Sequence, residues 1–157
     1  MNSPTSVTMI NNMGASATPM SSGEVYTSLQ QGIIDGAENN ETVLVDDGHG
    51  EVAKSYTYTQ HQYLPDIVII SVETWDGMTE EEQQGLLDSM KGAWQAHEDE
   101  WLKIVDRNKT GAEEMGVQFY EIDKTAFIEA CKPQQEAFCA QSEDNARYFA
   151  DFQSYLK

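Results

Sequence analysis

Few side chains in this sequence of 157 residues could perform chemistry. Its three histidines have no serine or cysteine placed nearby in the sequence to act as a nucleophile. Its two cysteines, Cys131 and Cys139, are too far apart on a continuous helix for a disulfide and lack metal-binding spacing. The GxSxG, HExxH and glycine-rich phosphate-loop motifs are also missing. The sequence therefore predicts no catalytic residue, no metal ligand and no cofactor, and it disfavours an enzyme.

The polar segment Asp35–Asn40 is better suited to binding than to catalysis. Short polar residues that follow an amphipathic helix often form only a turn, and spacing alone favours that interpretation. Alternatively, a short strand here could present one amide side chain to a cleft. An asparagine side chain both donates and accepts hydrogen bonds, so it suits a carboxylate or hydroxyl ligand.

Three other features are candidates for a site. His61 lies in a predicted strand beside a crossover, where a binding role and a structural role are both open. His97 lies on the apolar face of a predicted long helix and is expected to be a core histidine. The segment Asp46–Glu51 is acidic and rich in glycine, but its spacing is not that of a calcium-binding EF-hand loop. A solvated loop or helix end is the favoured interpretation there.

Strands and helices alternate along the predicted chain, which indicates an α/β fold. Capping and periodicity signals predict helices over 4–12, 22–33, 41–45, 79–108, 124–138 and 142–156, and strands over 36–39, 56–63, 67–72 and 117–121. The unbroken β-branched run Ile67–Val72 is typical of a strand buried on both faces. The helix Thr79–Asn108 would be ~45 Å long, more than the ~30 Å width of a small domain, so it should cross more than one packing unit.

Charge and hydropathy exclude several partners. The chain has 9 basic and 27 acidic residues, a net charge of −18. Nucleic acids and anionic lipids bind clustered Lys and Arg side chains, and no such cluster is present. No apolar run approaches the ~18 residues of a membrane helix, so direct membrane insertion is not expected.

Several motifs together resemble a known family. The segment Ser16–Asn40, SATPMSSGEVYTSLQQGIIDGAENN, is similar to a characteristic stretch of the substrate-binding proteins of TRAP (tripartite ATP-independent periplasmic) transporters, of the C4-dicarboxylate-binding type. The match continues through HGEVAKSY at 49–56, PDIVIISVETWDGMTEEEQ at 65–83 and FIEACKPQQEAF at 127–138. The resemblance covers essentially the whole chain.

The resemblance implies the C-terminal half of a two-lobed periplasmic binding protein with one long helix that spans both lobes. Residues 1–64 would form part of the second ligand-binding lobe with its crossover strand. Residues 65–108 would form the return strand to the first lobe and the long helix, and 109–157 the C-terminal strand and helices. The implied protein is a periplasmic receptor that binds a small carboxylate and passes it to the membrane subunits of the transporter.

The resemblance also implies a ligand site made of Asn39, Asn2, Ser22 and His61. Asn39 matches the motif asparagine that hydrogen-bonds the ligand carboxylate, Asn2 and Ser22 match cleft-lining positions, and His61 falls near the cleft. The family's carboxylate-binding arginine would lie just upstream of Met1. The chain is therefore expected to continue upstream into the signal peptide and most of one lobe, and to carry unpaired sheet edges.

The GAENN variant, with HGEV and the stretch around His61, is similar to family members that bind sugar acids, so a hexuronate is the first expectation for the ligand. A C4-dicarboxylate or another small organic acid is the alternative. A rival of a different class is an acidic, non-enzymatic interaction module that works as this half-length chain.

Overall fold

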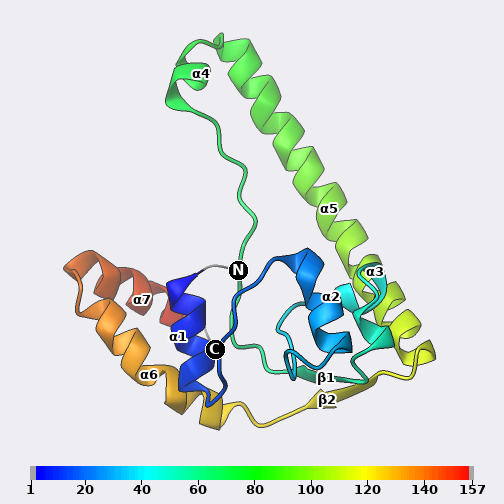
Figure 1. The fold of residues 1–157 in the computed structure, drawn as a ribbon. Helices are drawn as coiled ribbons and strands as arrows, with labels where there is room; N and C mark the ends of the chain where they lie inside the picture. The colour runs from blue at the N-terminus through cyan, green and yellow to red at the C-terminus, as the bar shows by residue number, and fades with distance from the viewer. Residues whose placement is uncertain (1–2, 156–157) are drawn as a thin grey trace. The chain divides into compact units, whose positions relative to one another are not determined.

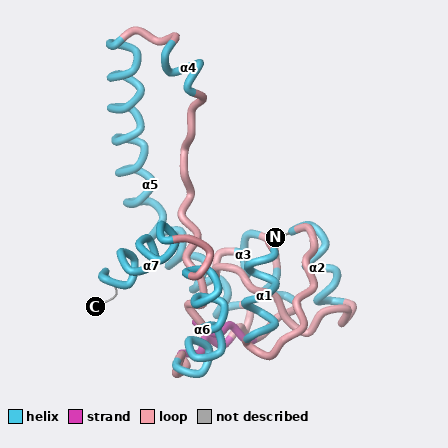
Figure 2. The backbone as a smooth tube through the Cα atoms, turned by 90° about the vertical axis from the view of Figure 1, so that its left-hand side faces the viewer, coloured by secondary structure: helices cyan, strands magenta, loops and turns pink. Residues whose placement is uncertain are grey.

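The computed structural model describes residues 3–155, which are mostly helical (Figure 1). The helices are α1 (Pro4–Asn12), α2 (Ser22–Gln30), α3 (Val43–Asp46), the 3₁₀ helix η1 (His49–Glu51), α4 (Val72–Asp76), α5 (Glu80–Glu114), α6 (Thr125–Cys139) and α7 (Glu143–Tyr155). Strands β1 (Ser55–Tyr58) and β2 (Gln118–Glu121) form a two-stranded sheet. Figure 2 shows how much of the remaining chain is loop.

The chain divides into two compact units. The first comprises Met1–Ala37, Thr57–His61 and Tyr120–Lys157, and the second comprises Glu38–Tyr56 and Gln62–Phe119. Both strands contain a point where the chain passes from one unit to the other. The expected α/β class is thus present, with helices far outweighing strands in the described residues.

In the first unit, α1 packs against α6, and α6 against α7. Gln134 links the first pair, because its side-chain nitrogen donates to the carbonyl of Thr5 at 2.9 Å. The second pair is joined by Asn145, whose side chain donates to the carbonyl of Phe138 at 3.1 Å. Helix α1 begins with Pro4 at its first turn and is followed by Gly14 at φ +92°, which confirms the predicted limits.

The second unit is built on the C-terminal part of α5. Its buried apolar residues are Leu44, Ala112 and Val117, and the half-buried rings of Tyr56 and Phe119 pack against them. The two rings have centroids 5.5 Å apart. Helix α5 has 35 residues and continues past the predicted end at Asn108. Asn108 itself is fully buried and donates to the carbonyl of Ile104 at 3.0 Å.

Gly50 lets η1 approach its neighbours closely. A β-carbon built on Gly50 would lie 2.9 Å from the carbonyl oxygen of Leu44 and 3.1 Å from the sulfur of Met115. Any larger residue would therefore push η1 away from α3 and from the end of α5. The Asp46–Glu51 segment is thus a helix end and a short 3₁₀ helix, with His49 and Gly50 buried.

Two sequence expectations are wrong for a shared reason. The run Ile67–Val72 forms no strand: residues 67–71 are coil, Val72 begins α4, and Ile67, Val68 and Ile69 are 77%, 78% and 84% exposed. His97 is exposed rather than in a core, and its ring lies 5.9 Å from that of Trp101. In each case the described chain provides no neighbour to cover the apolar side chains.

Smaller differences concern strand limits and cysteines. Strand β1 ends at Tyr58, although the alternating pattern predicts a strand to Tyr63, and residues 36–39 are loop. Cys131 and Cys139 are free thiols and are half-buried rather than buried. Among the described residues, none of the helices is both long enough and apolar enough to span a membrane.

Candidate functional site

Asn39 lies in the loop between α2 and α3, in the second unit, and is exposed. Its backbone carbonyl accepts a hydrogen bond from the Tyr56 hydroxyl at 2.9 Å. Because the Tyr56 ring packs against the core of this unit, the bond ties the loop to a fixed support. The side-chain oxygen of Asn39 accepts from the backbone N–H of Asn40 at 2.9 Å. The loop is therefore held in place while the side chain of Asn39 stays accessible.

The residues on either side of Asn39 hold the loop at two more points. The side-chain oxygen of Asn40 accepts from the backbone N–H of Thr42 at 3.1 Å and from its hydroxyl at 2.7 Å. The carboxylate of Glu38 accepts from the side chain of Gln62 at 3.2 Å. Three successive residues are thus anchored, which gives the loop the preorganisation that a ligand-binding position requires.

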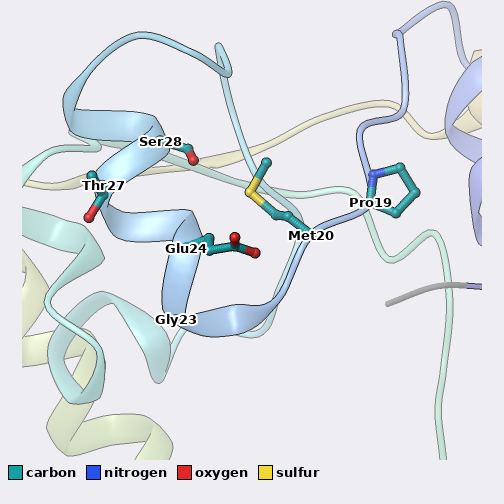
Figure 3. A pocket seen from close by; sticks show the side chains of 6 residues that line it. All are labelled: Pro19, Met20, Gly23, Glu24, Thr27 and Ser28. Atoms are coloured by element: carbon teal, nitrogen blue, oxygen red, sulfur yellow. The ribbon is translucent and has the colours of Figure 1, made fainter.

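Ser22 begins α2 in the first unit and is exposed. It adjoins a hollow of about 450 Å³, a size usual for small-molecule sites, which is lined by Pro19, Met20, Gly23, Glu24, Thr27 and Ser28. Figure 3 shows the side chains of Met20 and Glu24 directed into the space between α2 and the segment that leads to it. The hollow lies within the Ser16–Asn40 motif.

The charge in this hollow comes from Glu24. The hydroxyl of Ser21, and then its backbone N–H, donate to the Glu24 carboxylate and hold its pKa below the usual value. Glu24 is therefore ionised at neutral pH. An ionised carboxylate repels another carboxylate but accepts hydrogen bonds from hydroxyl groups. The hollow thus suits the hydroxyl-bearing part of a ligand better than its acid group.

His61 ends the short first-unit segment that contains the second half of β1. It is half-buried, and its Nδ1 lies 2.6 Å from the hydroxyl of Thr59. Gln60, between them, has a φ of +48°, which is unusual for a residue with a side chain. This local bend fixes the ring of His61 relative to the strand.

The structure does not bring all the candidate residues into one described site. Ser22 and His61 belong to the first unit, and Asn39 belongs to the second. Asn2 lies outside the described residues. Sequence reasoning missed Met20, Glu24 and Ser28 as lining residues. The sequence pattern marks Glu24 only as a capping residue, and the adjacent Pro-Met pair is the signal that could have indicated the hollow.

Within residues 3–155, no group of three or more His, Cys, Asp or Glu side chains could hold a metal ion. The candidate positions instead offer hydrogen bonds from an amide, a hydroxyl, an imidazole and a carboxylate. Such groups bind a polar organic molecule without a covalent step.

The family model for bacterial extracellular solute-binding protein, family 7, matches residues 1–142. The chain belongs to this family. A relative in Salmonella typhimurium, the uncharacterised protein YiiZ, is 43% identical over 134 residues, which are 85% of this chain and 41% of YiiZ. The expected family is thus confirmed, and its members are solute-binding proteins.

Two solved structures of family members resemble the chain closely. A TRAP periplasmic solute-binding protein from Anaerococcus prevotii, with bound glucuronate, is 42% identical, with a TM-score of 0.91 over 99% of this chain and 50% of that one. A second, from Sulfitobacter with bound galacturonate, is 37% identical, with a TM-score of 0.85 over 94% of this chain and 49% of that one. The chain therefore spans about half the length of these relatives.

Proposed function

We propose that the chain is part of a periplasmic receptor that binds a hexuronate for a TRAP-type importer. The observation that carries this proposal is the similarity to the glucuronate-bound Anaerococcus prevotii protein over 99% of the chain. The galacturonate-bound Sulfitobacter protein supports the same ligand class, because the two sugars differ only at one hydroxyl-bearing carbon.

The local chemistry agrees with a sugar acid. Such a ligand has one carboxylate and several hydroxyl groups, so its receptor needs both donors and acceptors. We assign the carboxylate to the amide of Asn39, together with charged groups outside this chain. We assign the hydroxyl groups to positions around Ser22 and Glu24 and to His61, with Asn2 as a further polar contact. A C4-dicarboxylate would bring a second negative charge toward the ionised Glu24, which disfavours it.

The organisation we propose has three parts. Residues 1–64 belong to one ligand-binding lobe and its crossover, 65–108 form the return strand and the long helix, and 109–157 form the C-terminal strand and helices. In this arrangement no covalent chemistry occurs. The receptor would close on its ligand in the periplasm and be recognised by the membrane subunits of the importer.

The test is calorimetric titration of the chain, expressed with any in-frame upstream sequence of its gene, against glucuronate, galacturonate, succinate and malate. We expect both hexuronates to bind at least ~100-fold more tightly than either dicarboxylate, a difference of about 2.7 kcal/mol. Tighter binding of succinate or malate would replace the hexuronate assignment with the dicarboxylate alternative. No binding of any acid would contradict the receptor proposal itself.

A further inference from the structure

The segment Tyr63–Ile70 lacks hydrogen-bond partners. None of its backbone or side-chain groups is hydrogen-bonded to the described part of the chain. Backbone N–H and C=O groups in a folded protein are almost always paired, either with other protein groups or with water. Eight successive residues in this state present the edge of an extended strand on both sides.

The same segment is strongly apolar. The exposed fractions of Ile67, Val68, Ile69 and Ile70 are 77%, 78%, 84% and 43%. Burying one such side chain stabilises a protein by about 1.5–3 kcal/mol, so this run has a large unused capacity for burial. Successive side chains of a strand point to opposite faces, and both faces are apolar here. The segment therefore fits between two neighbours in a sheet rather than at a solvated edge.

The relatives indicate which polypeptide could supply those neighbours. The match to the Anaerococcus prevotii protein includes 99% of this chain and only 50% of the relative, so half of the relative has no counterpart here. A second copy of this chain is a poorer partner, because each copy has a net charge of −18 and the two would repel each other.

We propose that residues 66–70 add as a strand to a sheet supplied by the half of the family fold that this chain lacks, and that this pairing forms even when the two halves are separate chains. Main-chain hydrogen bonds to the added strand would provide affinity, and the alternating apolar side chains would fix its register. The inference rests on family membership and does not require the ligand class proposed above.

The experiment mixes this chain with the uncovered half of the Anaerococcus prevotii protein and measures mass by light scattering after gel filtration. We expect a one-to-one complex, with each half alone eluting separately. As a reference, the same uncovered half is mixed with its own natural counterpart half. If neither pair associates, or if only the natural pair does, the proposal is wrong, because it asserts pairing between separate chains.

Variants separate strand addition from general stickiness. Ile69→Lys should weaken the association at least ~100-fold, because a charge would enter the sheet, whereas Ile69→Val should retain it. The matched control is Ile33→Lys, at an isoleucine of the first unit that is 66% exposed, and it should leave association unchanged. Equal losses for Ile69→Lys and Ile33→Lys would overturn the proposal, as would a homodimer of the unmixed chain that Ile69→Lys disrupts.

The outcome is distinguishable from that of the hexuronate proposal. A complex that forms but binds no organic acid would contradict the proposed ligand and leave the strand addition standing. Ligand binding by the covalent, longer gene product without association of separate halves would do the reverse.

Discussion

Asn39 and Asn40 are adjacent amides with different surroundings. The side chain of Asn39 is exposed, and its oxygen bonds only to the next backbone N–H among the described groups, whereas that of Asn40 holds Thr42 by two hydrogen bonds. We expect Asn39→Ala to weaken hexuronate binding by about 1–3 kcal/mol, because the ligand carboxylate loses a hydrogen bond. Calorimetry on the longer, ligand-binding form of the protein measures this change.

Asn40→Ala is the matched control for that variant. It removes the acceptor for the buried Thr42 at the start of α3, so it should lower the free energy of unfolding by about 0.5–2 kcal/mol. Urea denaturation would show the loss. An Asn39→Ala protein with unchanged affinity would remove Asn39 from the site, whatever the behaviour of Asn40→Ala.

Lys54 is a single residue that connects two elements. Its ammonium donates to the carbonyl of Gly50 at 2.7 Å and to that of Met115, the C-cap of α5, at 2.9 Å. A positive charge at a helix C-terminus is favourable, so Lys54→Met should cost about 1–2 kcal/mol of unfolding free energy in urea. The control Lys103→Met breaks only an exposed ion pair with Glu100 and should cost under about 0.5 kcal/mol. Equal losses would contradict the role given to Lys54.

At the scale of elements, the glycines of α5 and of η1 should respond in opposite directions to the same change. Gly85 lies inside α5, and a β-carbon added there would meet no atom within 4 Å, so Gly85→Ala should raise the free energy of unfolding by about 0.5–1 kcal/mol. Gly50→Ala should lower it by about 1–3 kcal/mol, because its β-carbon would meet the carbonyl of Leu44. Thermal unfolding of the two variants gives the signs directly.

The first turn of α5 should make that helix sensitive to acid. The backbone N–H of Thr79, and then its hydroxyl, donate to Glu82 and hold the pKa of that carboxyl below its ordinary value of 4.5. A group whose pKa is lower in the folded state stabilises the fold above its unfolded pKa, and this stabilisation is lost as the pH falls through the folded value. Stability should therefore fall below pH 4.5, and the fall should be smaller in Glu82→Gln. Parallel urea titrations at several pH values test this, and identical pH profiles would exclude the contribution of Glu82.

Local signals predict the elements that local interactions stabilise. The pairs Ser21 with Glu24 and Thr79 with Glu82 mark the starts of α2 and α5, and both capping boxes are present. The sequence places the end of α5 too early, because the turn at Gly116, which has a φ of +85°, signals the start of a strand as readily as the end of a helix. For residues 67–72, composition alone predicts a strand. A strand also needs a neighbouring strand, and none of the described chain supplies one.

At the scale of the whole molecule, the family was predictable from motifs, whereas the site was predictable only residue by residue. The motif placed Asn39 and Ser22 correctly in the sequence, but their surroundings depend on which unit holds each of them. No periodicity or spacing reports on that division, because it arises from contacts between distant segments. The exposure of His97 has the same origin: its helix has an apolar face, but the covering partner is not among residues 3–155.

The division into two units leads to a prediction about cooperativity. The buried apolar residues Leu44, Ala112 and Val117 all lie in the second unit, whereas α6 and α7 contain no buried residue. Leu44→Ala should therefore cost about 2–5 kcal/mol in the second unit alone. Hydrogen exchange should accelerate in α3 and the C-terminal part of α5 and stay unchanged in α6 and α7. The control Ile128→Ala, at a residue that is 55% exposed in α6, should leave α3 unaffected. Uniform acceleration in Leu44→Ala would mean that the units unfold together, and that the stability of each depends on the other.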